Sequence, residues 1–269
     1  MESRKIGDIR LIFESGEDDT ADLIAETCEK AIQLAREDWG FGPPEDCHIY
    51  VMTSPLRFIF QSATLSWKIM LVATMPFWLA RVSRTWHYSA AWTQRYGRRT
   101  AIGVKPARLI EQSDRSIGLR MFVEETDVAV NVQHVTCHEL VHACSAHLRL
   151  PMWLNEGIAT ATVDRFLGRQ TIRQDTLQYM KDYLPKKAPP TYRELSRMDG
   201  EAIAYHGMRG YWLVRYLEDK HPGFLKGLFS QGKDSKTIER DIAAELGVEV
   251  DSYWLNIDKI VTDYFINGE

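Results

Sequence analysis

Hydrophobic and polar positions in the first fifty residues change from strand-like to helix-like spacing and back again. Residues 8–13 (DIRLIF) alternate between polar and apolar side chains and predict a strand, and residues 47–52 (CHIYVM) predict a second one. Between them, residues 21–39 carry apolar side chains at helical spacing, and Gly40 marks the end of that pattern. The chain is therefore expected to start with a β-α-β arrangement.

Residues 58–96 are expected to form a hydrophobic insertion in this first region. Its central run, Ile69 to Ala80 (IMLVATMPFWLA), is apolar throughout and is bounded by Lys68 and Arg81. The run is shorter than the roughly 20 apolar residues that a membrane-spanning helix needs. Three interpretations remain open: a helical insertion packed on the rest of the chain, a hydrophobic lid over a cleft, or membrane association at the surface through residues 62–82.

The second half of the chain has mostly helical patterns. Residues 99–110 and 118–124 predict strands, and helices are expected at about 130–147 and 153–166, separated by Pro151. Later segments are helical in pattern almost to the C-terminus. We therefore expect an α+β fold with a mixed β-sheet, in which residues 1–125 form an N-terminal α/β region and residues 126–269 a mostly helical part. The alternative is one continuous domain.

Composition and charge exclude some classes of protein. The chain of 269 residues has 45% hydrophobic and 26% charged residues, which is ordinary for a globular protein, and its net charge is −4. A broad nucleic-acid-binding surface needs a basic face, so nucleic acid is not an expected partner. The first residues, MESRKIGDIR, lack the apolar core of a secretion signal, and we expect a cytoplasmic location. The oligomeric state cannot be read from the sequence.

The four cysteines form no pair with metal-binding spacing. In a reducing compartment, buried free thiols are expected rather than disulfides. These cysteines are Cys28, Cys47, Cys137 and Cys144.

The main candidate for chemistry is His138-Glu139-Leu140-Val141-His142. Residues four apart on a helix lie nearly above one another, so His138 and His142 would direct both imidazoles to one place, with Glu139 beside them. This spacing is typical of a zinc site in which the Glu acts as general base. Apolar neighbours such as Leu140 and Val141 indicate a buried helix, where ionisable side chains need partners.

A second motif, Pro151-Met152-Trp153-Leu154-Asn155-Glu156-Gly157, follows closely. It predicts another helix, on which Glu156 is a plausible third ligand. A catalytic zinc site commonly uses three protein ligands and leaves one position for water. We therefore expect one Zn²⁺ per chain, bound by His138, His142 and Glu156.

Together the two motifs resemble the gluzincin zinc metallopeptidases, and they are most similar to the peptidase MA-like family, in which a short loop joins the motifs. The resemblance extends loosely over residues 100–265, including Ala204-Tyr205. It implies a zincin-like catalytic core and a role for Tyr205, or its neighbour His206, in stabilising the oxyanion. It also implies that residues 118–124, the strand before the motif helix, would hold the substrate backbone.

Other polar residues near the motifs have weaker claims. His147 and His134 are expected not to be ligands, since His147 lacks the spacing and the glycine of a metzincin third ligand. Thr160, Asn155 and Asp164 are candidates for orienting the ligands, and the sequence does not choose among them.

The function expected from these residues is zinc-dependent hydrolysis of peptide bonds in a peptide or protein substrate. Glu139 would take a proton from the metal-bound water and pass it to the leaving amine. The alternative is a zinc-binding regulatory or scaffold protein with little turnover, which could also associate with a membrane.

Overall fold

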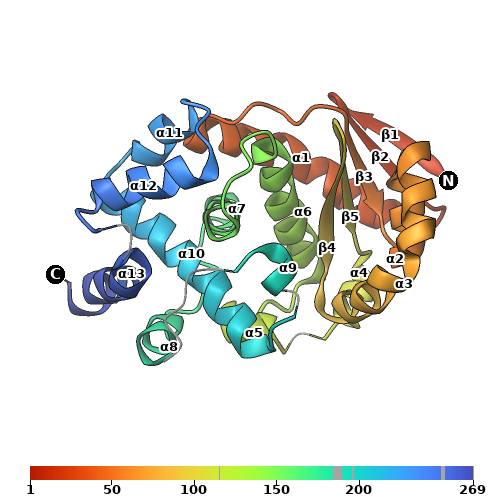
Figure 1. Cartoon of the computed structure of the whole chain (residues 1–269). Helices are drawn as coiled ribbons and strands as arrows, with labels where there is room; N and C mark the ends of the chain where they lie inside the picture. The colour runs from red at the N-terminus through yellow and green to blue at the C-terminus, as the bar shows by residue number, and fades with distance from the viewer. Residues whose placement is uncertain (115, 184–189, 196, 250–251, 269) are drawn as a thin grey trace. The chain divides into compact units, whose positions relative to one another are not determined.

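The computed structural model describes residues 1–114, 116–183, 190–195, 197–249 and 252–268 (Figure 1). It has the expected α+β class, with a mixed sheet and many helices. By its internal contacts the chain groups into two compact units, each built from separate segments. The first comprises Met1–Leu34, Gly42–Ser116 and Glu124–Cys144, and the second Ala35–Phe41, Ile117–Val123 and Ser145–Glu269. A domain boundary between residues 125 and 126 stays a prediction.

The first unit contains a five-stranded sheet in the order β1-β2-β3-β5-β4. The pairs β2–β3 and β3–β5 are parallel, whereas β1–β2 and β4–β5 are antiparallel, so the sheet is mixed. The predicted strands at 8–13 and 47–52 are confirmed. The strands are β1 Glu2–Ile6, β2 Ile9–Phe13, β3 Cys47–Val51, β4 Ala91–Tyr96 and β5 Arg99–Val104.

Each face of this sheet is covered by helices because the strands are apolar on both sides (Figure 1). Leu11, Ile49 and Ile102 are fully buried and share one face, on the side of α1 (Asp18–Trp39) and α6 (Val128–Ser145). On the other face, a cluster around Tyr50 and Phe58 includes residues of α2 (Pro55–Ser62) and α3 (Leu65–Tyr88).

The hydrophobic insertion is thus two helices followed by a strand. Trp67, Trp78 and Trp86 of α3 pack against the cluster on the sheet, which fixes the inner side of that helix. Residues 91–96, which were grouped with the insertion, instead form the edge strand β4. Among the described residues, no helix has the length and apolar character needed to cross a membrane.

Lys105, just after β5, binds the C-terminal end of α3. Its side chain is 2% exposed, and Nζ donates to the carbonyl oxygen of Trp86 at 2.6 Å and to Ser113 Oγ at 2.7 Å. The ammonium also lies 4.3 Å from the centroid of the Trp86 ring. Burial lowers the pKa of Lys105 to about 8. The C-terminal turn of α3 is therefore held by a cation that the sequence did not single out.

The second unit is helical, and its centre is α7 (Met152–Leu167), most of whose residues are buried. Its closest partner is α10 (Gly200–Lys220), and two glycines make the approach possible. A Cβ on Gly157 would lie 2.4 Å from the carbonyl oxygen of Gly210, and one on Gly210 would lie 2.1 Å from that of Trp153. The remaining elements are α5 Gly118–Met121, α8 Thr176–Asp182, α9 Tyr192–Leu195, α11 Phe224–Phe229, α12 Ser235–Glu245, α13 Tyr253–Thr262 and a π-helical turn at Asp263–Asn267.

The predicted strand at residues 118–124 is wrong. Gly118–Met121 forms the short helix α5, and only Phe122 makes an isolated antiparallel bridge, with Ile172. The Met121 side chain of this segment packs at Gly207 of α10 instead of pairing in a sheet. Residues 99–110 were also predicted as one strand, but it ends at Val104 and Ala107–Glu111 forms helix α4.

Candidate metal centre

Two imidazoles converge on one side of α6, as their spacing predicts. The Nε2 atoms of His138 and His142 lie 3.0 Å apart, and the ring centroids lie 4.6 Å apart with the planes perpendicular. The other side of the helix is anchored in the core, because Cys137, Leu140 and Val141 are buried. The histidines are therefore only partly buried, on the less covered side of a well-anchored helix.

Glu139 is held beside these histidines by the edge strand of the same unit. Thr93 of β4 donates its hydroxyl to Glu139 Oε2 at 2.6 Å. Thr93 pairs with Ile102 across β4 and β5, so its side chain is on the face that carries α6. One carboxylate oxygen of Glu139 is thus fixed by a hydrogen bond, while the group keeps a second oxygen for other partners.

Glu156 lies one turn into α7 and has its own set of hydrogen bonds. Tyr192 of α9 donates its hydroxyl to Glu156 Oε1 at 2.8 Å, and accepts from Asn155 Nδ2 at 2.9 Å. Asn155 Oδ1 in turn accepts from Ser145 Oγ at 2.8 Å. The carboxylate is therefore oriented by a short chain of polar side chains in which Tyr192 is half exposed.

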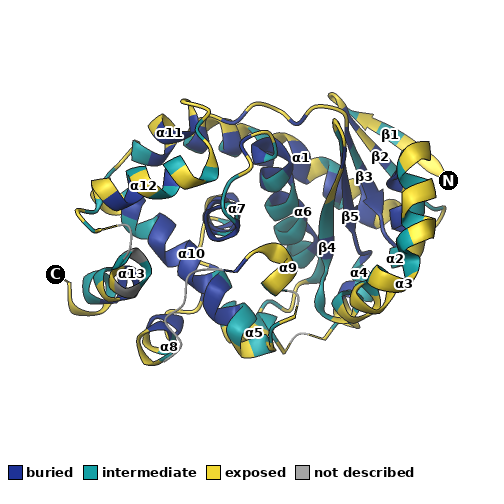
Figure 2. Ribbon diagram, viewed as in Figure 1, coloured by how far each residue is buried: buried dark blue, intermediate teal, exposed yellow. Residues whose placement is uncertain are grey.

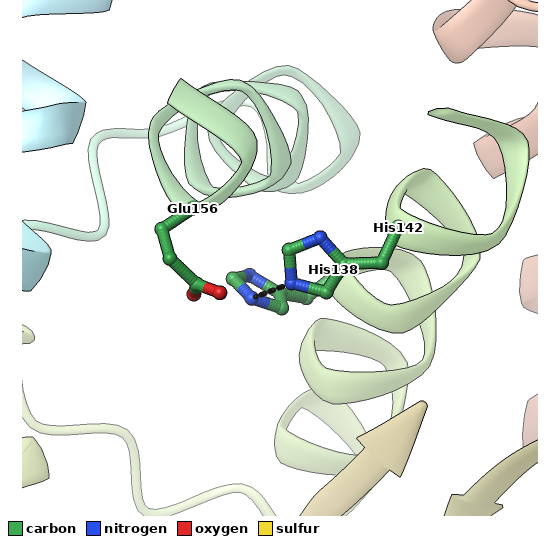
Figure 3. A group of neighbouring side chains, drawn as sticks. All are labelled: His138, His142 and Glu156. Atoms are coloured by element: carbon green, nitrogen blue, oxygen red, sulfur yellow. Dashed lines mark hydrogen bonds between the residues drawn. The ribbon is translucent and has the colours of Figure 1, made fainter. Parts of the chain in front are cut away.

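The ligand atoms of His138, His142 and Glu156 all lie within 4.8 Å of one another (Figure 3). Figure 3 shows the Glu156 carboxylate directed toward the same region as the two imidazoles. Ligands of a tetrahedral zinc at its usual bond lengths are about 3.4 Å apart, a separation that falls within this limit. Zinc is commonly bound by imidazole nitrogens and carboxylate oxygens, which is the set present here.

The other histidines near the motif do not join this group. Within the described residues, the set of clustered metal-binding side chains comprises His138, His142 and Glu156 only. His147 is exposed and lies just beyond the end of α6, as expected for a solvated side chain. His134, one turn before His138, is partly buried.

Tyr205 lies in the core of the second unit. It is fully buried, its hydroxyl donates to Asp258 Oδ2 at 2.5 Å, and its ring stacks on Tyr183 at 4.1 Å. The same carboxylate accepts from Arg209 Nε at 2.6 Å. Burial raises the pKa of the Tyr205 hydroxyl well above its ordinary value. The hydroxyl is therefore engaged in a buried network between α10 and α13.

His206, the alternative to Tyr205, is also buried. Its Nδ1 has no hydrogen-bond partner in the part of the chain that the structure describes. Burial, together with the nearby Arg209 guanidinium, lowers the pKa of His206 to about 4. The imidazole is neutral near pH 7.

The three residues considered for orienting the ligands behave differently. Asn155 is linked to Glu156 through Tyr192. Thr160 donates instead to the backbone carbonyl of Glu156 at 2.9 Å. Asp164 accepts from Thr171 and Tyr211 in a buried cluster.

Thr93 and Tyr192 were missed by sequence reasoning, since a threonine in a strand and a tyrosine in a short helix carry no local signal.

The cysteines are not part of the site. All four are free and buried, as expected. Burial raises the pKa of Cys137, on α6, to about 12, so the thiol stays protonated and is a poor metal ligand.

A cavity of about 560 Å³ in the second unit is lined by charged residues, including Arg165, Arg215 and Glu218. These charges are already paired, since Arg165 contacts Asp38 and Glu218, and Arg215 contacts Asp164. We therefore assign it no chemistry.

Comparison of the chain with protein-family models gives no match, and no curated protein sequence is significantly similar to it. The geometry of the site is therefore the basis for assigning a function to this chain.

Proposed function

We propose that this chain is a zinc-dependent peptidase of the gluzincin type, with a zincin-like core, that hydrolyses peptide bonds in a peptide or protein substrate. The observation that carries the proposal is the grouping of His138, His142 and Glu156 within 4.8 Å, with Glu139 next to the histidines. Its donor set suits one Zn²⁺, held by those three side chains.

The bound zinc would lower the pKa of its water ligand toward neutrality and polarise the scissile carbonyl. His138 and His142 would hold the ion through the two Nε2 atoms that already face each other. A carboxylate has two oxygens, so Glu156 can accept from Tyr192 with one and bind the ion with the other. Tyr192 is then a positioning residue for the third ligand.

Glu139 would act as the general base. Thr93 occupies Oε2, which leaves Oε1 to receive a proton from the attacking water and to return it to the leaving amine. Holding one oxygen restricts the rotation of the carboxylate, so the base is positioned before substrate binds. Thr93 is a positioning residue in this scheme.

Substrate backbone would bind along β4 rather than along residues 118–124. Within the described residues β4 pairs only with β5, so its other edge has backbone groups available for strand addition. Thr93 lies in the middle of this strand and contacts Glu139, so a peptide added there would run next to the base.

Tyr205 keeps its predicted role in stabilising the oxyanion only if its hydroxyl leaves Asp258. His206 would also have to move to reach a substrate, because it is only 4% exposed. A cytoplasmic location also remains a prediction.

The test combines metal analysis of the purified chain with the Glu139→Gln variant, assayed on an unfolded protein substrate. We expect one zinc per chain in both proteins and a loss of turnover of about 100-fold or more in the variant, because general acid–base catalysis contributes about that much. Glu124→Gln, an exposed neighbour before α6, is the matched control and should behave as wild type.

Two results would contradict the proposal. Absence of zinc from a folded sample supplied with zinc would remove the metal site. Bound zinc with no turnover in the wild type, or equal turnover in Glu139→Gln, would instead favour the alternative of a zinc-binding regulatory or scaffold protein.

A further inference from the structure

The outer side of α3 is apolar and open to solvent. Leu65 is 77% exposed, Ile69 68%, Val72 56% and Phe77 89%, and α3 contains no buried residue along its described length. Figure 2 shows the helix in the colours of exposed and partly buried residues throughout. Met70 and Leu79 extend the same surface. Exposed apolar surface concentrated on one element commonly marks an interaction site.

This exposure is not the result of a loosely attached helix. The inner side of α3 carries Trp67, Leu71 and Trp78, which pack in the cluster on the sheet. The C-terminal turn is held by Lys105. A helix on the surface of a globular protein usually has a polar outer side. Here the core needs only the inner side, so the outer side is available for a partner.

The charged side chains of α3 itself are all basic, whereas Arg57, Arg99 and Arg108 nearby in the sequence are paired with carboxylates. Residues 47–110 contain nine Lys and Arg residues and no Asp or Glu, although the whole chain has net charge −4. The rest of the chain therefore carries a net charge of −13. Three of these basic residues, Lys68, Arg81 and Arg84, are on α3 itself. At helical spacing, Lys68 and Arg81 lie at the two edges of the exposed apolar positions, and Arg84 lies two turns beyond Phe77 on the same side.

One more basic residue, Arg98, lies near the start of α3. Trp67 packs on Tyr96, with ring centroids 5.7 Å apart, and Tyr96 ends β4 immediately before the turn to β5. Gly97 and the exposed Arg98 follow Tyr96, so this turn adds one positive charge beside the N-terminal end of the helix, whereas Arg99 is paired with Asp46.

We propose that α3 lies on the surface of an anionic lipid bilayer. Ile69, Val72 and Phe77 would enter the boundary between headgroups and acyl chains, while Lys68, Arg81 and Arg84 contact anionic headgroups. The helix stays parallel to the membrane because its inner side is packed on the sheet. The proposal is independent of peptidase activity.

Charge favours a membrane over a second copy of this chain. A symmetric contact through α3 would bring Lys68, Arg81 and Arg84 of two copies together, and the segment has no carboxylate to pair with them. An anionic bilayer supplies both a layer of negative charge and an apolar layer below it.

The experiment is flotation of the full chain with vesicles, either of phosphatidylcholine alone or of equal parts phosphatidylcholine and phosphatidylglycerol. We expect binding to the mixed vesicles and much weaker binding to the neutral ones, with the difference reduced by added salt. The double variant Ile69→Ser, Phe77→Ser should bind the mixed vesicles at least about tenfold more weakly, since each buried apolar side chain contributes that order of affinity.

Charge reversal tests the contribution of the basic residues of α3. Lys68→Glu and Arg84→Glu should each weaken binding about fivefold or more, because one basic side chain near an anionic surface contributes about that factor. Two exposed residues elsewhere are matched controls: Leu119→Ser on α5 and Lys236→Glu on α12 should leave binding unchanged. Melting curves of all variants check folding, and the replaced α3 side chains are exposed or partly exposed.

Three results would overturn the proposal. These are absence of binding to the mixed vesicles, equal binding to both kinds of vesicle, and variants of α3 that bind like the wild type. Sedimentation velocity of the same proteins without lipid gives a further check. A dimer that only the α3 variants dissociate, without vesicle binding by the wild type, would assign this surface to a second copy.

Discussion

At the scale of single residues, Tyr192 makes the contact that distinguishes Glu156 from an ordinary surface carboxylate. The Tyr192 hydroxyl donates to Glu156 Oε1 and accepts from Asn155, so it fixes one oxygen of the candidate ligand. The tyrosine is 50% exposed, which means that its removal should cost the fold little.

Tyr192→Phe should weaken zinc binding by about tenfold or more, because partners that orient a ligand commonly contribute that much to metal affinity. The unfolding free energy of the metal-free protein should stay within about 0.5 kcal/mol of wild type, as for most exposed substitutions. Competition with a chelating dye measures the affinity. Tyr179→Phe, which removes a hydroxyl that donates to the Glu201 carbonyl, is the control and should leave zinc affinity unchanged.

Tyr205→Phe is the contrasting replacement. It leaves a buried carboxylate oxygen of Asp258 without its tyrosine donor, so we expect a loss of stability of about 1–3 kcal/mol in urea unfolding. Turnover per folded molecule then decides its catalytic role. Unchanged turnover would remove Tyr205 from the proposed mechanism.

At the scale of elements, the position of Glu156 depends on the contact between α7 and α10. Gly157 follows the candidate ligand directly and touches the backbone of Gly210, so a side chain at either position would push the helices apart. The glycine in the second motif is therefore required for packing, whatever the chemistry of its neighbour.

Gly157→Ala should destabilise the protein by about 1–3 kcal/mol or more, as expected for overpacking against backbone, and should lower zinc affinity by displacing α7. Urea unfolding and metal titration measure the two effects. Gly227→Ala in α11 has open space at the Cβ position and should be neutral or slightly stabilising. Equal stability of Gly157→Ala and wild type would mean that the two helices adjust without cost.

At the scale of the whole molecule, a metal held by His138, His142 and Glu156 would join side chains of two consecutive helices, α6 and α7. A ligand that binds only the folded chain stabilises it by mass action, by about 4 kcal/mol at a thousand times its dissociation constant.

Removing zinc with a chelator should therefore lower the melting temperature by several degrees, and adding zinc back should restore it. Calorimetry of the wild type, His142→Ala and His147→Ala tests the assignment. Zinc should raise the melting temperature of the wild type and of His147→Ala, and should not change that of His142→Ala. A full response in His142→Ala would place the ion elsewhere.

Much of the site follows from local geometry that the sequence contains. The convergence of His138 and His142 depends only on the helical repeat, and Pro151 separates the two motif helices at the predicted place. The sheet strands at 8–13 and 47–52 were also predictable from alternation, because side chains of a strand point to opposite faces. These features need information from only a few neighbouring residues.

Other features depend on contacts between distant residues, which only the tertiary structure decides. Thr93 reaches Glu139 across 46 positions, and Tyr192 reaches Glu156 across 36. Residues 118–124 were predicted as a strand, yet Gly118–Met121 form a short helix whose Met121 side chain packs at Gly207 of α10. The apolar run of α3 does not reveal which side the sheet covers, since both sides are hydrophobic. Local periodicity fixes where a side chain lies on its own element, whereas its partner depends on how the elements pack.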